Sequence, residues 1–206
     1  NEPRTDEGSE VKDPIRVAID SRKNGMPLYF KDLRDNTYIF FRAFIEGLTE
    51  NISPNWTPTN YIGRSEPVYT YERGERDISF NLKLAAQTKS ELSFIYEKIN
   101  RLTSLAYPQY DTDEYLGGNK VRMKPPLTKF RLGDLYGTTN DEMLGFIKSI
   151  SYTVDQTSPY ETEVGARVPH HINVALTYQV IHSEVPSLDT KFYGFDGFAV
   201  GVGRNF

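Results

Sequence analysis

The chain has 206 residues and no cysteine, and its 24 Lys and Arg stand against 28 Asp and Glu, for a formal net charge of −4. This length suits one large domain or two small ones, and the lack of cysteine excludes disulfides, thiolate metal sites and cysteine nucleophiles. The acidic balance argues against a strongly basic nucleic-acid clamp, and no apolar run approaches the roughly 18 residues of a membrane-spanning helix.

Aromatic residues are unusually frequent for a chain of this hydrophobicity. They make up 13% of the chain, with 14 Tyr and 12 Phe, while hydrophobic residues as a whole reach only 38%. Because Tyr and Phe favour strands, the composition predicts a β-rich protein.

Residues 1–36 are expected to form an N-terminal arm with short strands. The first 13 residues are polar and carry charges of both signs, so they cannot bury enough surface to offset their ordering entropy. Alternating apolar positions at 15–19 predict a short strand, and Asn24-Gly25 predicts a turn. A second short apolar stretch lies within residues 27–36.

Residues 37–185 are expected to form the main domain. In residues 37–48 both alternating sets of positions carry apolar side chains, which predicts a strand covered on both faces. Residues 51–60 hold two prolines and the only tryptophan, and are expected to be an irregular loop. The pattern of residues 61–76 predicts a strand that is interrupted by Gly63 and Pro67.

Two later segments alternate cleanly between apolar and polar residues, which predicts half-buried strands of an antiparallel sheet. Their inward-facing residues are expected to be Ile78, Phe80, Leu82 and Leu84 in the first, and Ile172, Val174, Leu176, Tyr178 and Val180 in the second.

Between them the hydrophobic period changes to that of a helix. Apolar residues at helical spacing predict an amphipathic helix over about residues 89–107. Thr88 and Glu91 match a capping box at its start, and Pro108 ends it. Because the helix directly follows a half-buried strand, we expect it to pack back on the sheet.

The remaining segments predict strands separated by long loops. Residues 109–127 indicate a long polar loop, and residues 127–137 a strand and turn. Residues 143–155 indicate a strand, interrupted by Lys148, whose expected single apolar face consists of Leu144, Phe146, Ile150, Tyr152 and Val154. Residues 186–206 form a Gly- and Phe-rich C-terminal tail. The fold class is therefore mainly β (α+β), an antiparallel sandwich or barrel with one flanking helix.

No catalytic, metal or cofactor site can be assembled from the sequence. His170 and His171 are neighbours on a strand, so they point to opposite faces and cannot chelate one metal. Nucleophile-elbow, phosphate-loop and zinc-protease motifs are absent. The acidic residues of the 109–127 loop lie in a polar segment and do not indicate a catalytic pair of carboxylates. The glycines of the tail are not followed by a predicted helix, so they do not indicate a nucleotide site. We expect a protein that is not an enzyme and holds no cofactor or metal.

A stretch of mixed charges and tyrosines suggests contacts between subunits instead. Aromatic residues among arginines can indicate single-stranded nucleic-acid binding, but glutamates alternate with these arginines and favour ion pairs within or between subunits. The candidate inter-subunit contacts are Arg64, Glu66, Tyr69, Tyr71, Arg73, Glu75 and Arg76, with Phe192, Tyr193, Phe195 and Phe198 in the tail. Since exposed strand edges must be paired, blocked or covered, we expect an assembly protein whose neighbours complete a barrel.

Four segments within residues 37–185 form a recognisable pattern. The first is the run from Trp56 through Ala86 with the helix that follows it. The other three are Pro126, Leu127, Phe130, Leu132, Gly133 and Asp134; Gly145, Ile147, Ser149, Ile150, Ser151 and Asp155; and Pro169, Ile172, Val174, Leu176, Tyr178, Val180 and Ile181. Together these segments resemble the tail-tube-like protein family of contractile, T4-like bacteriophages, which includes baseplate–tail-tube junction proteins, or tube initiators.

The resemblance implies a virion protein, assembled in the host cytoplasm, of which six copies form a ring. Inner sheets of the six copies would make a continuous barrel through which DNA passes without specific binding. The ring would sit between the baseplate hub and wedge proteins and the first tail-tube ring, initiate tube assembly and have no enzymatic activity. Two alternatives remain open: another tail ring of the same fold, such as a tube or hub protein, and a carbohydrate- or cell-wall-binding β-sandwich module.

Overall fold

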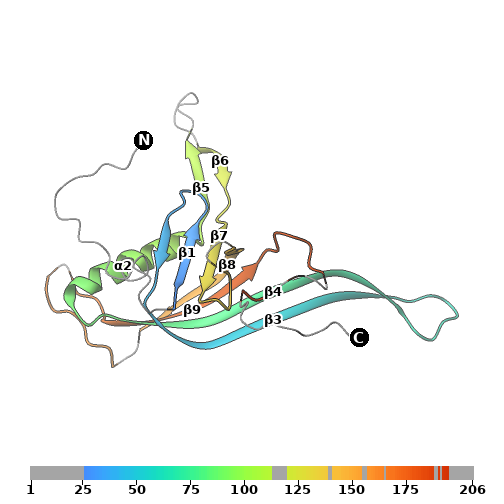
Figure 1. Ribbon diagram of the computed structural model, residues 1–206, viewed down its shortest axis with the longest axis horizontal. Helices are drawn as coiled ribbons and strands as arrows, with labels where there is room; N and C mark the ends of the chain where they lie inside the picture. The colour runs from blue at the N-terminus through green and yellow to red at the C-terminus, as the bar shows by residue number, and fades with distance from the viewer. Residues whose placement is uncertain are drawn as a thin grey trace, which may run out of the picture.

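The protein is described here from a computed structural model, which covers residues 26–112, 120–138, 141–154, 157–164, 166–187, 190 and 192–194. Within these ranges the chain is mainly β, with nine strands and one helix (Figure 1), which confirms the predicted fold class. Several predicted features lie outside the described residues, namely the strand at 15–19, the turn at 24–25, the centre of the 109–127 loop, and Phe195 and Phe198.

Seven strands form one antiparallel sheet with the order β2-β1-β7-β8-β9-β4-β3. Two further strands, β5 and β6, form a separate small hairpin. The strands are β1 Leu28–Asp32, β2 Tyr38–Phe40, β3 Phe44–Thr59, β4 Val68–Ala85, β5 Gln109–Thr112, β6 Lys120–Lys124, β7 Thr128–Leu132, β8 Met143–Thr153 and β9 His171–Val180, and the helix is α2 Lys89–Ser104.

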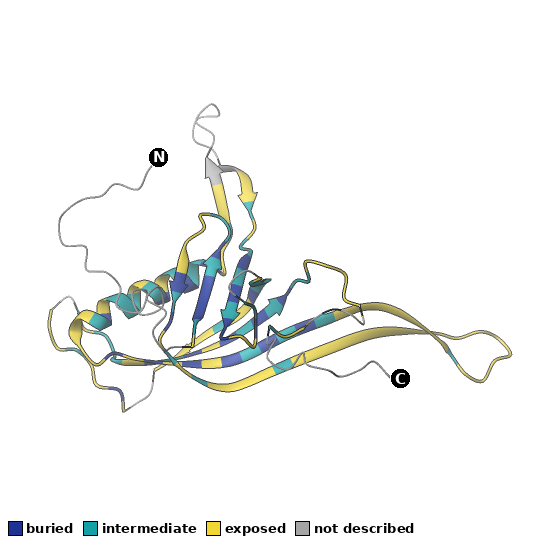
Figure 2. Cartoon of the chain, viewed as in Figure 1, coloured by how far each residue is buried: buried dark blue, intermediate teal, exposed yellow. Residues whose placement is uncertain are grey.

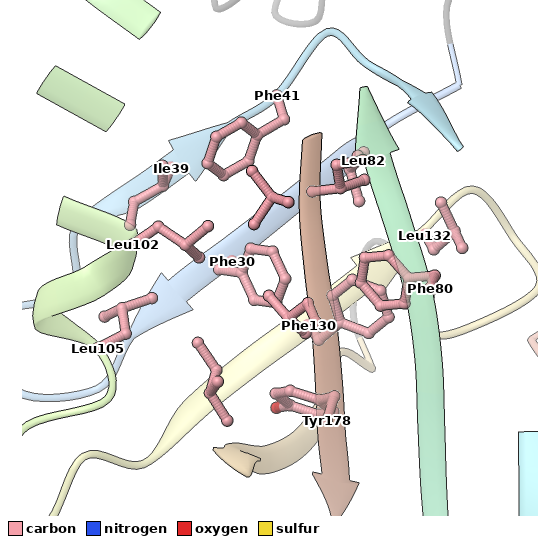
Figure 3. Packing of buried hydrophobic residues seen from close by; sticks show 14 of the residues in the cluster. Phe30, Ile39, Phe41, Phe80, Leu82, Leu102, Leu105, Phe130, Leu132 and Tyr178 are labelled. Carbon is pink, nitrogen blue, oxygen red and sulfur yellow. The ribbon is translucent and has the colours of Figure 1, made fainter. Parts of the chain in front are cut away.

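The alternation predicted for β4 and β9 is confirmed. Every predicted inward residue of the two strands is buried, and the register pairs Ile78 with Tyr178 and Leu82 with Val174. Phe30 of β1 and Phe130 of β7 pack into the same core, which α2 closes with Leu102 and its C-cap residue Leu105 (Figure 3).

Helix α2 begins as predicted and ends earlier than predicted. The Thr88 side chain accepts a hydrogen bond from the Glu91 backbone N–H, and the Glu91 carboxylate accepts one from the Gln87 N–H. The helix ends at Ser104, where Arg34 donates hydrogen bonds to the carbonyls of Ser104 and Tyr107. These contacts satisfy carbonyls that the end of a helix leaves without partners.

The β1–β2 turn is fixed to α2 by a buried carboxylate. Asp32 is 1% exposed and accepts hydrogen bonds from both Arg34 and Arg101. Strand β1, which carries Asp32, lies inside the seven-stranded sheet, so the core includes part of the segment assigned above to an N-terminal region.

Three expectations from the sequence were wrong in their details. Residues 51–59 are strand, because β3 is an edge strand and tolerates proline where the missing N–H would point away from its partner. The 109–127 loop contains β5 and β6. In β8 the register shifts between Ile147 and Ser149, so Ile147 faces the core in place of Leu144 and Phe146, while Ile150 packs against the core as predicted.

The strand predicted to be covered on both faces is covered on one. Ile39 and Phe41 are buried, and Ala43 and Ile45 pack against the core. On the opposite face Phe44 is 75% exposed.

Candidate interaction surface

The β3–β4 hairpin extends far beyond the body of the domain. We call its outer part, residues 51–75, the arm. Every arm residue except Pro67 and Glu75 is exposed. Figures 1 and 2 show the arm as a two-stranded ribbon that projects from the sheet, with no other described strand or helix packed on it. The chain reverses direction at the tip of the arm, where the Arg64 backbone N–H donates a hydrogen bond to the Tyr61 carbonyl.

A β-bulge at Glu72 determines which side chains of β4 lie on each face of the arm. The register pairs Asn55 with Arg73 and Trp56 with Tyr71, which leaves Glu72 without a partner in β3. Glu50 pairs with the core residue Ile78, and every second pair from there toward the tip lies on the same face of the ribbon. This face carries most of the arm's apolar residues. We call this the aromatic face, made up of Ile52, Pro54, Trp56, Pro58, Tyr69, Tyr71 and Gly74.

The aromatic face continues the buried face of β4 beyond the body of the domain. Ile52, Trp56, Tyr69 and Tyr71 are each 52–61% exposed. The Trp56 and Tyr71 rings meet edge to face with centroids 5.1 Å apart. A Cβ on Gly74 would lie 2.8 Å from the Tyr71 hydroxyl, so glycine leaves room for this ring to lie along the ribbon.

The opposite face of the arm is polar, and its charged groups are paired locally. Glu72 accepts hydrogen bonds from Asn55 and Thr57. Arg73 forms an ion pair with Glu75 at 2.8 Å. The sequence-based expectation of ion pairs in this stretch is therefore met for this pair within the chain, while Arg64 and Glu66 lie exposed at the tip.

The root of the arm is held by a buried ion pair between Glu50 and Arg76. Arg76 is 4% exposed, and its Nε donates to Glu50. The hydroxyls of Tyr136 and Tyr193 both donate to the second Glu50 oxygen at 3.0 Å. Partial burial alone would raise the pKa of Glu50, but the hydrogen bond and charge of Arg76, with the two hydroxyls, hold that pKa below its usual value.

The same root anchors the C-terminal segment. Arg76 donates to the Phe192 carbonyl at 3.0 Å and lies 5.5–5.9 Å from the ring centroids of Tyr136, Phe192 and Tyr193. The Gly194 N–H donates to the Leu135 carbonyl. Three of the predicted inter-subunit contacts, Arg76, Phe192 and Tyr193, thus meet one another within the chain.

The remaining predicted contacts separate into three places. Tyr69 and Tyr71 lie on the aromatic face, Arg73 and Glu75 on the polar side of the arm, and Arg64 and Glu66 at the tip. Sequence reasoning missed the role of Ile52 and Trp56, although Ile52, Pro54, Trp56 and Pro58 recur with the period of two that marks one strand face.

A second surface lies on the outside of the sheet, opposite the core. It is formed by neighbouring positions of β8, β9 and β4 and consists of small, uncharged residues. We call it the small polar face: Ser79, Asn81, Ser149, Ser151, Thr153, Asn173, Ala175 and Thr177. Ion pairs flank it, Lys148 with Asp77 and Lys83 with Glu46, both at 3.0 Å.

A cavity of about 660 Å³ lies beside the root of the arm. Two of its charged lining residues are bonded to groups outside the cavity: Arg76 donates to Glu50, and Glu142 accepts a hydrogen bond from Tyr29 and forms an ion pair with Lys129. Burial and the nearby Arg76 charge lower the pKa of His182 in its wall.

Neither metal ligands nor membrane-spanning helices are found in the described ranges. No group of three or more His, Asp or Glu residues there could hold a metal ion. No helix in these ranges is long and apolar enough to cross a bilayer.

No protein-family profile matches the chain, and no curated protein matches it.

Proposed function

We propose that the chain is a structural, non-enzymatic protein of a contractile phage tail. It forms a ring of six copies at the baseplate–tail-tube junction, initiates assembly of the tube and provides a channel for DNA. The small polar face is the observation that carries this function, together with the sequence resemblance. That face is the free side of a sheet whose other side is the core, so it is available to line a channel.

The chemistry of the small polar face suits passage of DNA. A protein holds a phosphate backbone by neutralising it with Lys and Arg. This face presents hydroxyl, amide and methyl groups, and the two lysines that flank it, Lys148 and Lys83, are each paired with a carboxylate. Such a surface neither binds the polyanion tightly nor repels it.

The sheet also has the two different edges that a closed ring requires. The edge strand at one side is β3, and the edge strand at the other is β2. An interface between unlike surfaces closes into a ring when the rotation between copies allows it. Unpaired strand edges are then satisfied by neighbours.

Sedimentation equilibrium and negative-stain microscopy of the full chain test this function. We expect a closed species of six times the chain mass with a central opening. A protein that stays monomeric at every concentration would exclude it.

A carbohydrate-binding module is the second candidate, favoured by the exposed Trp56 and its neighbouring tyrosines. Rings that stack on sugars work with polar groups that bond the sugar hydroxyls. The neighbours of Trp56 on its own face are Ile52, Pro54, Pro58 and Tyr71, while Glu72 lies on the opposite side and is bonded to Asn55 and Thr57. Titration with soluble cell-wall oligosaccharides measured by calorimetry tests this candidate directly.

A further inference from the structure

We infer that the aromatic face of the arm is an interface for a second copy of this chain, which covers Trp56, Tyr69 and Tyr71 by side-chain packing. This inference rests on the proposed self-assembly and names the surface that would carry it. Its starting point is the continuity of the aromatic face with the buried face of β4: the same side of the ribbon is core at Ile78 and solvent-exposed at Tyr71.

The described part of the chain offers no cover for this face. The arm leaves the body as a ribbon, and none of the described segments packs on it (Figure 2). Trp56 contacts Tyr71 of the adjacent strand, and that pair still leaves each ring about half exposed, at 53% and 52%. Exposed aromatic patches bordered by polar residues commonly mark interaction sites.

Two prolines exclude strand addition as the main mode of contact. Pro54 and Pro58 lie four residues apart on the edge strand β3, at positions of the same parity, with Trp56 between them. A proline is tolerated there because its missing N–H points away from β4. The outer backbone edge of the arm therefore lacks two of the donors that an added strand would need, and contact must come through the side chains of the face.

The charged residues of the arm favour a partner surface that carries both positive and negative charges. Arg64 and Arg73 alternate with Glu66, Glu72 and Glu75, so the arm presents no single-sign field. A nucleic acid or a strongly acidic surface would gain little from it. A copy of the same chain, with 24 basic and 28 acidic residues, has the matching near-balanced charge.

The size of the face favours a repeated contact over an isolated pair. An aromatic side chain buries about 150–250 Å² when covered, so three half-exposed rings offer on the order of 300 Å² of further burial. A stable two-body interface buries about 800 Å² on each partner. In a ring every copy both donates an arm and receives one, so each subunit is held by two such contacts and by the sheet edges.

Trp56 is the only tryptophan, so its fluorescence reports on this face alone. We would record its emission maximum and its quenching by acrylamide over a dilution series of the full chain, with the oligomeric state measured by sedimentation on the same samples. We expect the emission to shift to shorter wavelength and the quenching to fall as the chain assembles.

A double variant, Tyr69→Ser with Tyr71→Ser, tests the same point. Because tyrosines are enriched among the residues that carry most of the binding energy of an interface, we expect the concentration needed for assembly to rise roughly tenfold or more. Tyr107→Ser is the matched control, since Tyr107 is 65% exposed but lies after α2, away from the arm. Circular dichroism verifies that both variants fold.

The outcomes separate this inference from the proposed function. Assembly with unchanged Trp56 emission and quenching overturns the inference and leaves the ring intact. Assembly into protected dimers that never close supports the inference and overturns the ring. A Trp56 shift caused by soluble cell-wall oligosaccharides, with none caused by protein concentration, overturns the inference in favour of sugar binding. A chain that remains monomeric overturns both.

Discussion

Phe80 of β4 and Phe130 of β7 stack with ring centroids 5.3 Å apart and planes inclined by 14°, although two strands, β8 and β9, separate β4 from β7 in the sheet. Neighbouring strands lie about 4.8 Å apart, so a flat sheet would hold these two strands about 14 Å apart. The contact therefore requires the sheet to curl around its core. The core is enclosed by one curved sheet and α2, which packs on one side of that sheet.

Replacing Phe130 by alanine should destabilise the fold severely. Phe130 is fully buried and its ring contacts those of Phe30, Phe80 and Tyr178. Loss of a buried phenylalanine costs about 3–5 kcal/mol of unfolding free energy, because the cavity closes only in part. Urea unfolding measures the loss. Phe44→Ala, at a 75% exposed site, is the control and should change stability by less than about 1 kcal/mol.

The elements that sequence reasoning predicted well are those in which one period runs unbroken. In β4 from Ile78 to Leu84, and throughout β9, every second residue is apolar and buried, and the cap at Thr88 fixes the start of α2. Side-chain parity was lost wherever a strand gains a residue. Such an extra residue is present in β3 near Gly47, in β4 at Glu72 and in β8 at Lys148. Beyond each of them, the apolar side chains occupy positions of the other parity.

The candidate surface was only partly predictable for the same reason. Tyr69 and Tyr71 were selected among charged residues, but their common face with Trp56 depends on the bulge at Glu72. Arg76 looked like its neighbours Arg64 and Arg73. Only the tertiary fold brings it to Glu50, Phe192 and Tyr193, which are 26, 116 and 117 positions away in the chain.

The Glu50–Arg76 pair should make stability depend on pH in the acid range. The folded-state pKa of Glu50 lies below its ordinary value, so the pair stabilises the fold fully above the unfolded pKa of about 4.3. That stabilisation is lost as the pH falls through the folded pKa. Urea unfolding at pH 7 and pH 3 should show a larger acid loss for the wild type than for Glu50→Gln. Glu75→Gln serves as the control at the arm surface. An equal acid loss in Glu50→Gln and wild type would contradict the assignment.

Gly145 should tolerate no side chain. A Cβ there would lie 2.1 Å from the Gln179 carbonyl oxygen and 2.6 Å from the Tyr178 ring. Gly145→Ala must therefore push β8 away from β9, and we expect poor soluble yield or a loss of more than about 2 kcal/mol, in the range of overpacked cores. Gly74→Ala is the comparison, since its Cβ would meet only the mobile end of Tyr71. Native-like stability of Gly145→Ala would show that the two strands do not approach as described.

Asp32 should be essential for docking α2. Its carboxylate is buried and bonded to Arg34 and Arg101, so Asp32→Ala removes the one carboxylate that both guanidinium groups share. Breaking a buried pair in this way costs about 3–5 kcal/mol. Asp35→Ala is the matched control: Asp35 also contacts Arg101 but is 45% exposed, and we expect a change below about 1 kcal/mol. Thermal and urea unfolding of both variants would reveal any reversal of this order.

The orientation of the sheet in the ring is the central claim, and the cysteine-free chain makes it directly measurable. Two single substitutions, Ser151→Cys on the small polar face and Ser93→Cys on the exposed side of α2, place the same thiol on opposite sides of the curved sheet. Each variant would be assembled, labelled with a maleimide gold cluster and imaged end-on by electron microscopy. We predict gold in the central channel for Ser151→Cys and at the outer rim for Ser93→Cys. Gold from Ser151→Cys at the rim, or the absence of rings in the unlabelled protein, would contradict the account.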